Sequence, residues 1–147
     1  MTDDTETTTA PPAPLREDRD QLLTRIVAIF NLNSEAKVGI TLTVSGVVVS
    51  GTLVSGAAYF DAANETWSKG DLAAIWSLEV EHYRQLADGT DKADLSTKIA
   101  RTGYIHLLDA VVHEGGRQLG VAAWRGRLTE VSGWSLGALS QSPSHPD

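Results

Sequence analysis

Cysteine is absent from this chain of 147 residues, so neither a disulfide framework nor a zinc site with thiolate ligands can form. Long hydrophobic runs are absent too, because Thr, Ser and Gly interrupt the apolar stretches, whereas a membrane-spanning helix needs about 18 apolar residues in a row. The four histidines are scattered and do not suggest a set of metal ligands. We therefore expect no metal, no other cofactor and no membrane partner.

Recognisable catalytic motifs are also lacking. The sequence has no nucleophile elbow and no Ser-His-Asp arrangement. Gly115-Gly116 is followed by neither a helix start nor the Lys-Ser/Thr of a phosphate-binding loop. Asp71, Glu79 and Glu81 are expected on the solvated face of a helix rather than as an acid–base pair. The sequence thus favours a binding or assembly module over an enzyme.

The charge balance is acidic. There are 19 Asp and Glu residues against 12 Lys and Arg residues, which gives a formal net charge of −7 at pH 7. A negatively charged protein repels the phosphate backbone, so nucleic acid is not an expected partner. The lack of cysteine and of a cationic, apolar signal segment favours a cytoplasmic location.

Composition divides the chain into a tail, one domain and a second tail. Residues 1–14 are rich in Thr, Pro and acidic side chains and have almost nothing to bury, so we expect them to be disordered. Residues 15–139 carry enough apolar side chains for a single core. Residues 140–147 are a polar Pro/Ser tail that is also expected to be disordered.

The first helix is predicted to begin at Asp18 or Asp20 and to end near Asn31. Apolar residues recur on one side at helical spacing, so this side should lie on the strands that follow. The predicted stripe comprises Leu22, Leu23, Ile26, Val27, Ile29 and Phe30.

A helical insert is predicted over about residues 64–101. Its main helix begins at Asp71 and ends near Asp88-Gly89. One face carries Leu72, Ile75, Trp76, Val80, Tyr83 and Leu86. Residues 89–101 are polar and charged and are expected to add at most a weak extra turn.

The segment between the two helical parts has the period-two alternation of strands with one buried face. Residues 38–44 form the first strand, Ser45-Gly46 a tight turn, and residues 47–54 the return strand. Gly51 lies in the middle of the return strand and lets it bend sharply. Residues 57–60 are expected to extend or close this unit.

Strand character returns after the insert, at residues 104–113. One face is predicted to carry Ile105, Leu107, Asp109 and Val111, and the other Tyr104, His106, Leu108, Ala110 and Val112. Residues 114–117 are expected to form a glycine-containing loop, residues 121–128 the next strand, and residues 131–136 a short last strand.

The order of these elements resembles the Sm-like small β-barrel. Gly46, Gly51 and Tyr104-Ile-His-Leu-Leu-Asp-Ala110 occur in the order of that family's first motif, and Trp124-Arg125-Gly126 matches the hydrophobic-Arg-Gly triplet of its second. The resemblance implies a mostly β fold with helices (α+β): a five-stranded bent barrel with an N-terminal helix and a helical insert between strands. Tyr104 stands where RNA-binding members carry Asn, so the resemblance favours the fold over RNA binding.

A more specific resemblance is to the gas vesicle accessory protein GvpU family. It rests on residues 40–55, Tyr59-Phe60, Tyr104-Ile-His-Leu107 and residues 124–137. The last block is the most specific, because Trp, Arg, Gly, Val, Gly, an aromatic residue and Leu-Gly all fall in register.

This second resemblance implies a non-enzymatic protein, cytoplasmic and associated with gas vesicles, the protein-walled, gas-filled compartments of buoyant microbes. It implies a role in vesicle assembly or clustering through contacts with gas vesicle proteins. Small barrels leave edge strands open, and rings close these edges by pairing between subunits, so we expect a homo-oligomer. An Sm-like RNA-binding regulator is the alternative.

Six residues are the candidates for interaction: Tyr104, His106, Trp124, Arg125, Arg127 and Trp134. Arg125 and Arg127 share a strand face, and Arg125 either contacts an anion or partner or forms an ion pair with Asp109 across the strands. The two tryptophans either pack in the core or anchor an exposed interface. His106 is expected at the surface or half-buried, with a ligand or base role as the alternative.

Overall fold

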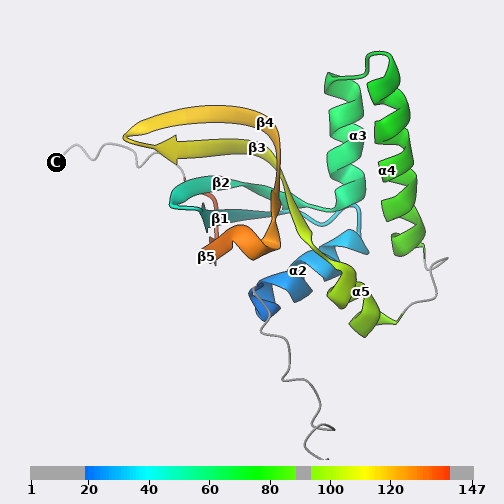
Figure 1. The fold of residues 1–147 in the computed structure, drawn as a ribbon, viewed down its shortest axis with the longest axis horizontal. Coiled ribbons are helices and arrows are strands. Elements are labelled where there is room, and N and C mark those ends of the chain that lie inside the picture. The colour runs from blue at the N-terminus through cyan, green and yellow to red at the C-terminus, as the bar shows by residue number, and fades with distance from the viewer. Residues whose placement is uncertain (1–18, 89–93, 140–147) are drawn as a thin grey trace, which may run out of the picture.

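The computed structural model describes residues 19–88 and 94–139. Both expected tails, 1–14 and 140–147, lie outside the described residues, as do residues 15–18 of the expected domain. In chain order the elements are α2 (Gln21–Asn31), β1 (Val38–Val44), β2 (Val47–Val54), α3 (Gly56–Thr66), α4 (Asp71–Ala87), α5 (Leu95–Arg101), β3 (Tyr104–Glu114), β4 (Arg117–Arg127), the 3-10 helix η1 (Leu128–Glu130) and β5 (Val131–Leu136). Figure 1 shows a bent sheet with the α3–α4 hairpin standing beside it and α2 and α5 below. The predicted mixed α+β class is confirmed.

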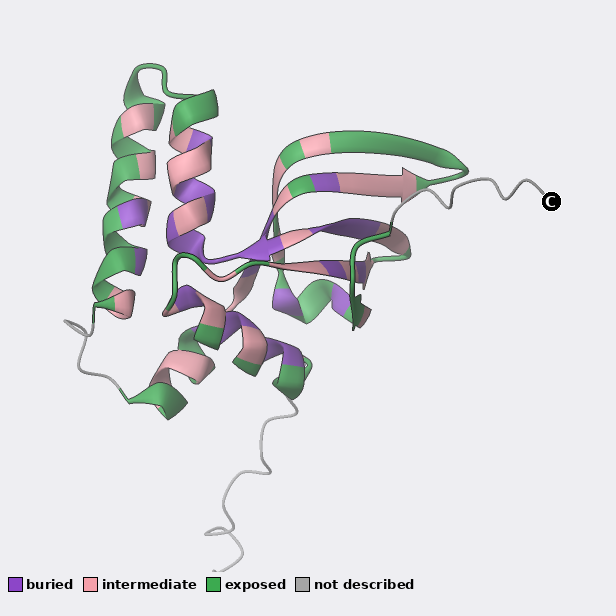
Figure 2. Cartoon of the chain, turned by 180° about the vertical axis from the view of Figure 1, so that it is seen from behind, coloured by how far each residue is buried: buried purple, intermediate pink, exposed green. Residues whose placement is uncertain are grey.

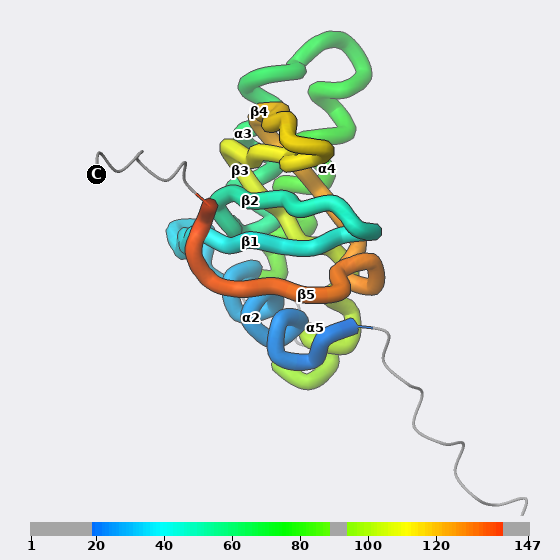
Figure 3. The backbone as a smooth tube through the Cα atoms, turned by 90° about the vertical axis from the view of Figure 1, so that its left-hand side faces the viewer, coloured from blue at the N-terminus to red at the C-terminus, as the bar shows by residue number. Residues whose placement is uncertain are grey.

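The strands form one antiparallel sheet of 5 strands in the order β4-β3-β2-β1-β5. β4 and β5 follow each other in the chain, joined by η1, yet they lie at opposite edges of the sheet (Figure 3). In the described part of the chain these two edges do not pair with each other. The sheet is therefore open and is not closed into the expected barrel.

Two tight turns set the register of the hairpins. Ser45 and Gly46 have φ values of 51° and 83°, and Gly115 and Gly116 have 58° and 79°. Positive φ at both central residues belongs to the two-residue turns that match the twist of antiparallel strands. The predicted Ser45-Gly46 turn is confirmed. The expected loop at residues 114–117 is instead a tight turn, which is why β4 begins at Arg117 rather than near residue 121.

A β-bulge in β3 changes which side chains face the core. Asp109 has a φ of 52°, and the pairing of β2 with β3 shifts register opposite Gly51. A bulge of this kind inserts one residue into a strand and reverses the alternation beyond it. The core face therefore runs from Ile105 and Leu107 to Ala110, so the predicted strict alternation along β3 is wrong beyond Leu108.

Gly51 is required where the bulge meets β2. A Cβ atom at this position would lie 3.1 Å from the Cα atom of Ala110 and 3.2 Å from the carbonyl oxygen of Leu108. Only glycine lets the two backbones approach this closely.

The N-terminal helix α2 packs on the core face of the sheet. Its N-cap residue Asp20 accepts a hydrogen bond from the backbone N–H of Leu23 at 2.9 Å, as a good cap does. The first core cluster comprises Leu23, Val27, Ile40, Leu42, Val49, Leu53, Ile105, Leu107, Ala110, Leu128 and Val131. The predicted helix is confirmed, but its stripe is narrower than expected, because Leu22 and Ile29 are 56% and 48% exposed.

The insert begins earlier than expected. Ser55 caps α3 by accepting a hydrogen bond from the N–H of Ala58 at 3.0 Å, and residues 57–60 are helical rather than extended. Its aromatic residues Tyr59 and Phe60 pack against Val80 and Tyr83 of α4 in a second core cluster. The helical insert therefore starts at Gly56 instead of near residue 64.

The end of the insert is also more ordered than expected. Asp94 caps α5 by accepting a hydrogen bond from the N–H of Thr97 at 2.8 Å, and the helix continues to Arg101. Arg19 ties α2 to the end of α5 by donating a hydrogen bond to the carbonyl oxygen of Thr102. Figure 2 shows that α4 is exposed over most of its length, with its buried residues confined to the side that faces α3.

Candidate functional site

His106 lies at the centre of the second core cluster. It projects from β3 on the face opposite Ile105 and Leu107 and is 0% exposed. Three aromatic rings of the insert surround it. The ring centroids of Tyr59, Phe60 and Tyr83 lie 4.8, 5.5 and 5.5 Å from the imidazole. The insert therefore covers this histidine, and the prediction that His106 is at the surface or half-buried is wrong.

Arg125 is paired with His106 across the sheet. The two residues are direct partners in the register of β3 and β4, and the Nε of Arg125 donates a hydrogen bond to the Nε2 of His106 at 3.1 Å. The same guanidinium lies over the ring of Tyr104, with 3.6 Å between its Cζ and the ring centroid, and 5.7 Å from that of Phe60. Cation–π contacts of this kind hold a guanidinium in one orientation.

The protonation state of His106 follows from this contact. Burial, and then the positive charge of Arg125, lower the pKa of His106 from 6.5 to about 3. The imidazole is therefore neutral near pH 7, and because its Nε2 accepts from Arg125, its hydrogen is on Nδ1. That Nδ1 is buried and has no hydrogen-bond partner. A buried donor without a partner lowers the stability of the folded protein, so this arrangement of His106 has an energetic cost.

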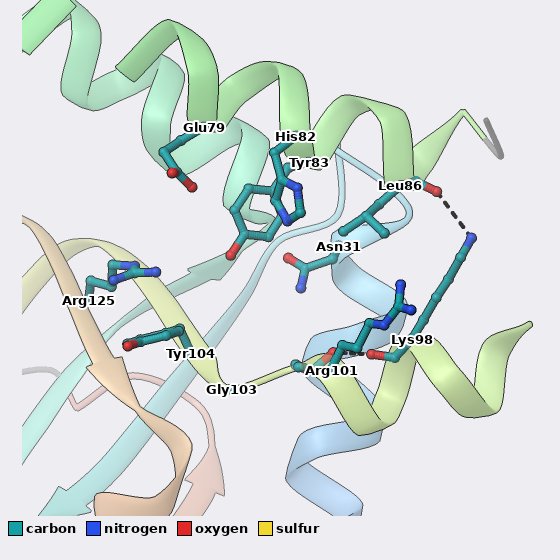
Figure 4. Close-up of a pocket in the computed structure, with 11 residues that line it drawn as sticks. Asn31, Glu79, His82, Tyr83, Leu86, Lys98, Arg101, Gly103, Tyr104 and Arg125 are labelled. Carbon is teal, nitrogen blue, oxygen red and sulfur yellow. Dashed lines mark hydrogen bonds between the residues drawn. The ribbon is translucent and has the colours of Figure 1, made fainter. Parts of the chain in front are cut away.

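A pocket of about 260 Å³ opens beside Arg125. It lies where the end of α2, the C-terminal half of α4, α5 and the start of β3 meet (Figure 4). The lining residues are Asn31, Glu79, His82, Tyr83, Leu86, Lys98, Arg101, Thr102, Gly103, Tyr104 and Arg125.

The lining of this pocket is cationic. Lys98, Arg101 and Arg125 contribute positive charge, and Glu79 is the one carboxylate among the lining residues. The chain as a whole has a formal net charge of −7, so the lining is opposite in sign to the chain. Lys98 is placed by a hydrogen bond from its Nζ to the carbonyl oxygen of Leu86 at 3.3 Å.

Polar groups without charge complete the lining. Burial raises the pKa of Tyr83, an effect that the charge of Arg125 partly offsets, so its phenol stays protonated near pH 7. Asn31 uses its Oδ1 to accept a hydrogen bond from the N–H of Gly56 at 2.9 Å, which leaves its amide N–H groups for other partners. The arrangement can therefore donate several hydrogen bonds to a bound group.

Three of the six predicted interaction residues, Tyr104, His106 and Arg125, meet at this site. The alternative ion pair with Asp109 is wrong, because Asp109 lies in the exposed bulge and no ion pair joins it to Arg125 in the described strands. Arg127 is exposed and is the cross-strand partner of Tyr104.

The two predicted tryptophans lie elsewhere. Trp124 and Trp134 are half-buried and pack against the first core cluster from opposite edges of the sheet. The backbone hydrogen bond from Leu23 and then the Trp134 side chain lower the pKa of Asp20, the cap of α2. Their positions favour packing in the core over an exposed anchor.

Sequence reasoning missed the aromatic residues of α3 and the basic residue of α5. The sequence places Tyr59 and Phe60 in an extended segment and Lys98 in a polar stretch with at most a weak extra turn. The signal that was available is the face of β3 shared by Tyr104, His106 and Leu108. This face is too apolar to be left in water and needed a covering layer.

Two further surfaces are open. β4 is a strand of 11 residues whose outer edge has no partner strand in the described chain. On α4, Leu72, Ile75 and Leu78 are 42%, 48% and 71% exposed; we call these three residues the α4 apolar surface. Unpaired edges and exposed apolar surfaces are both common sites of protein association.

Metal and membrane sites are not found in the described residues. No group of three or more His, Asp or Glu side chains within 19–88 and 94–139 is placed to hold a metal ion. In the same ranges, no helix combines the length and apolarity that crossing a membrane requires.

A family model described as "Gas vesicle protein GvpU-like" matches residues 20–139. The match includes the sheet, the insert and the pocket. No curated protein and no solved structure matches this chain.

Proposed function

The chain belongs to the GvpU-like family of gas vesicle proteins, and from this membership we propose that it is a non-enzymatic accessory protein that acts in gas vesicle assembly or clustering. It works through contacts with gas vesicle proteins and through self-association, in the cytoplasm where the vesicles lie. The family match over residues 20–139 is the observation that carries this proposal. It covers nearly every element of the fold, so the relationship is one of whole domains.

The sheet edges support self-association. β4 and β5 are the two unpaired edges of an antiparallel sheet and lie on opposite sides of the molecule. An edge strand can add a strand from another chain with main-chain hydrogen bonds alone. Pairing of β4 of one copy with β5 of the next would remove both edges, as closed rings do.

The same topology supports the proposed relationship to Sm-like barrels. The strongly bent strands and the 3-10 link η1 between β4 and β5 would let a barrel close if these edges approached each other. Pairing between neighbouring copies would serve the same purpose without closure within one chain.

The α4 apolar surface supports contact with the vesicle. Leu72, Ile75 and Leu78 are exposed residues of α4, and α4 is the helix of the α3–α4 hairpin that lies farther from the sheet (Figure 1). A hydrophobic helix face presented by a hairpin suits docking against an apolar groove or helix of a partner. Self-association by the sheet and vesicle contact by the hairpin would together link one vesicle to another.

Deletion of the gene in a cell that makes gas vesicles tests this proposal. Electron microscopy of thin sections would measure the number of vesicles per cell and the fraction that lie side by side. We expect a lower yield or dispersed vesicles, restored by the wild-type gene on a plasmid. Normal yield together with normal packing in the deletion strain would rule the role out.

Self-association is tested separately in solution. Size-exclusion chromatography with light scattering, at micromolar concentration, should give a mass that is a multiple of the 15.7 kDa of one chain. A strict monomer across this concentration range would contradict the proposal.

A further inference from the structure

We propose that the pocket beside Arg125 is a binding site for a small oxyanion, that is, a ligand that presents a carboxylate or a phosphate group. Arg125 would contact the anionic group directly, and Lys98, at the other end of the pocket, would add positive charge. This proposal is independent of the proposed role at gas vesicles, because it rests only on the chemistry of the pocket.

Arg125 is held in one orientation by its contacts with the sheet. One of its five N–H donors, on Nε, is used by His106, and the planar group is stacked on Tyr104. The four remaining donors are on the terminal nitrogens, beside the Tyr83 hydroxyl and the pocket (Figure 4). A guanidinium fixed in this way presents a fork that matches two oxygens of a carboxylate or phosphate.

Stability alone does not explain the pair of His106 and Arg125. The imidazole is wholly buried, its Nδ1 has no partner, and its one hydrogen bond is to a cation. An apolar residue would fill this space among three rings without an unpaired donor. What the neutral histidine adds is a fixed acceptor that aligns the guanidinium toward the pocket.

The positive charge of the pocket lining favours a bound anion. Lys98 comes from α5 and Arg125 from β4, and these two cations line opposite ends of the same pocket (Figure 4). Glu79 is the one carboxylate of the lining. Both positive charges favour an anion in the pocket, and the nearer charge, that of Arg125, favours it most.

The size of the pocket limits the ligand to a small anion. A volume of about 260 Å³ lies below the usual range of about 300–1,000 Å³ for drug-sized ligands. Inorganic phosphate or a small di- or tricarboxylate fits this space, whereas a nucleotide or an extended peptide does not. A bound anion would also join α4, α5 and the sheet, so it should stabilise the insert.

Binding of sodium phosphate and of sodium citrate to the full chain tests the proposal. Isothermal titration calorimetry and thermal unfolding would be run against sodium chloride at matched ionic strength. We expect saturable binding in the micromolar to low-millimolar range and a rise in melting temperature beyond that in chloride. The ratio of the two dissociation constants identifies phosphate or carboxylate as the preferred group.

Arg125→Gln and Lys98→Gln are the test variants, and Arg127→Gln is the matched control. Arg127 is exposed, lies two residues away on the same strand and does not line the pocket. We expect Arg125→Gln to weaken anion binding about tenfold or more, Lys98→Gln to weaken it by a smaller factor, and the control to leave it unchanged. Lys98→Gln keeps the proposal testable if Arg125→Gln does not fold.

Three results would overturn the proposal: no saturable binding of either anion, equal losses in Arg127→Gln and the test variants, or the same affinity in all three variants as in the wild type. Each of these outcomes leaves vesicle clustering in cells untouched, so failure of this proposal is distinguishable from failure of the proposed function.

Discussion

The Nε of Arg125 donates a hydrogen bond to the Nε2 of His106 at 3.1 Å across β3 and β4. A neutral histidine and a cation are thus joined at the boundary between the sheet and the insert. The pair is buried on the histidine side and opens into the pocket on the arginine side. One hydrogen bond therefore joins the protein interior to the pocket.

We predict that His106 makes the fold less stable as the pH falls from about 6.5. Its pKa in the folded protein is lowered to about 3 from the ordinary 6.5. Between these values the unfolded chain binds a proton that the folded chain does not, so unfolding becomes easier as pH falls. One such group contributes a slope of about 1.4 kcal/mol per pH unit.

Urea unfolding at pH 7 and pH 5 measures this slope. His106→Gln should flatten it, because glutamine does not titrate, whereas the control His82→Gln, at an exposed site, should leave it as in the wild type. An NMR titration that shows His106 protonated near pH 6 in the folded protein would contradict the prediction.

Gly56 marks the contact between the start of α3 and α4. A Cβ atom here would overlap the ring of Tyr83, and that ring also packs against His106. We expect Gly56→Ala to lower the free energy of unfolding by about 1–3 kcal/mol, as overpacking does. Gly120→Ala is the control, since no atom lies within 4 Å of a Cβ there, and its effect should stay within about 0.5 kcal/mol. Equal effects of the two substitutions in denaturant titrations would show that the contact is absent.

Asp20 caps α2 by accepting a hydrogen bond from the backbone N–H of Leu23. We expect Asp20→Ala to cost about 1 kcal/mol of stability at pH 7. The hydrogen bond from Leu23, and then the Trp134 side chain, lower the pKa of this carboxyl below 3.8. Its contribution is therefore present above that pH and lost as the pH falls through the lowered value. If thermal unfolding of Asp20→Ala matches the wild type at pH 7, the cap contributes nothing.

Much of the fold follows from local sequence signals. Ser45-Gly46 signals a tight turn because glycine accepts positive φ. Between residues 38 and 44 every second residue is apolar, as in a strand with one buried face, so both the hairpin and the sheet face could be predicted. The helix after Asp20 follows from its cap and its apolar spacing. The helix after residue 70 follows from its apolar spacing alone, because Asp71 lies inside the helix and no side chain caps its N-terminus. Each of these features is decided by neighbours in the chain.

The rest depends on contacts between distant segments. Asp109 has no local signal for a bulge, because its positive φ is set by the approach of β3 to Gly51 of β2. Tyr59 and Phe60 resemble a strand by composition and become helical because Ser55 caps them and α4 covers them. Since the burial of His106 depends on that cover, its environment could not be predicted either.

We expect the α4 apolar surface to contact gas vesicles. Leu78 is 71% exposed, so Leu78→Asp should leave the stability within about 0.5 kcal/mol of the wild type. The same change should weaken binding to gas vesicles by about tenfold or more, because a charge would have to be buried in the contact. Ser77→Asp adds the same charge at a neighbouring exposed position and serves as the control. Vesicle binding that is equal in both variants would mean that the contact lies elsewhere.

Flotation of gas vesicles with the purified chain tests the central claim most directly. Gas-filled vesicles rise during centrifugation, whereas a free protein stays in the liquid below. We predict that the chain rises with the vesicles and that vesicles mixed with it form clusters visible by electron microscopy. A chain that stays in the lower liquid at micromolar concentration, with the vesicles still dispersed, would contradict the account.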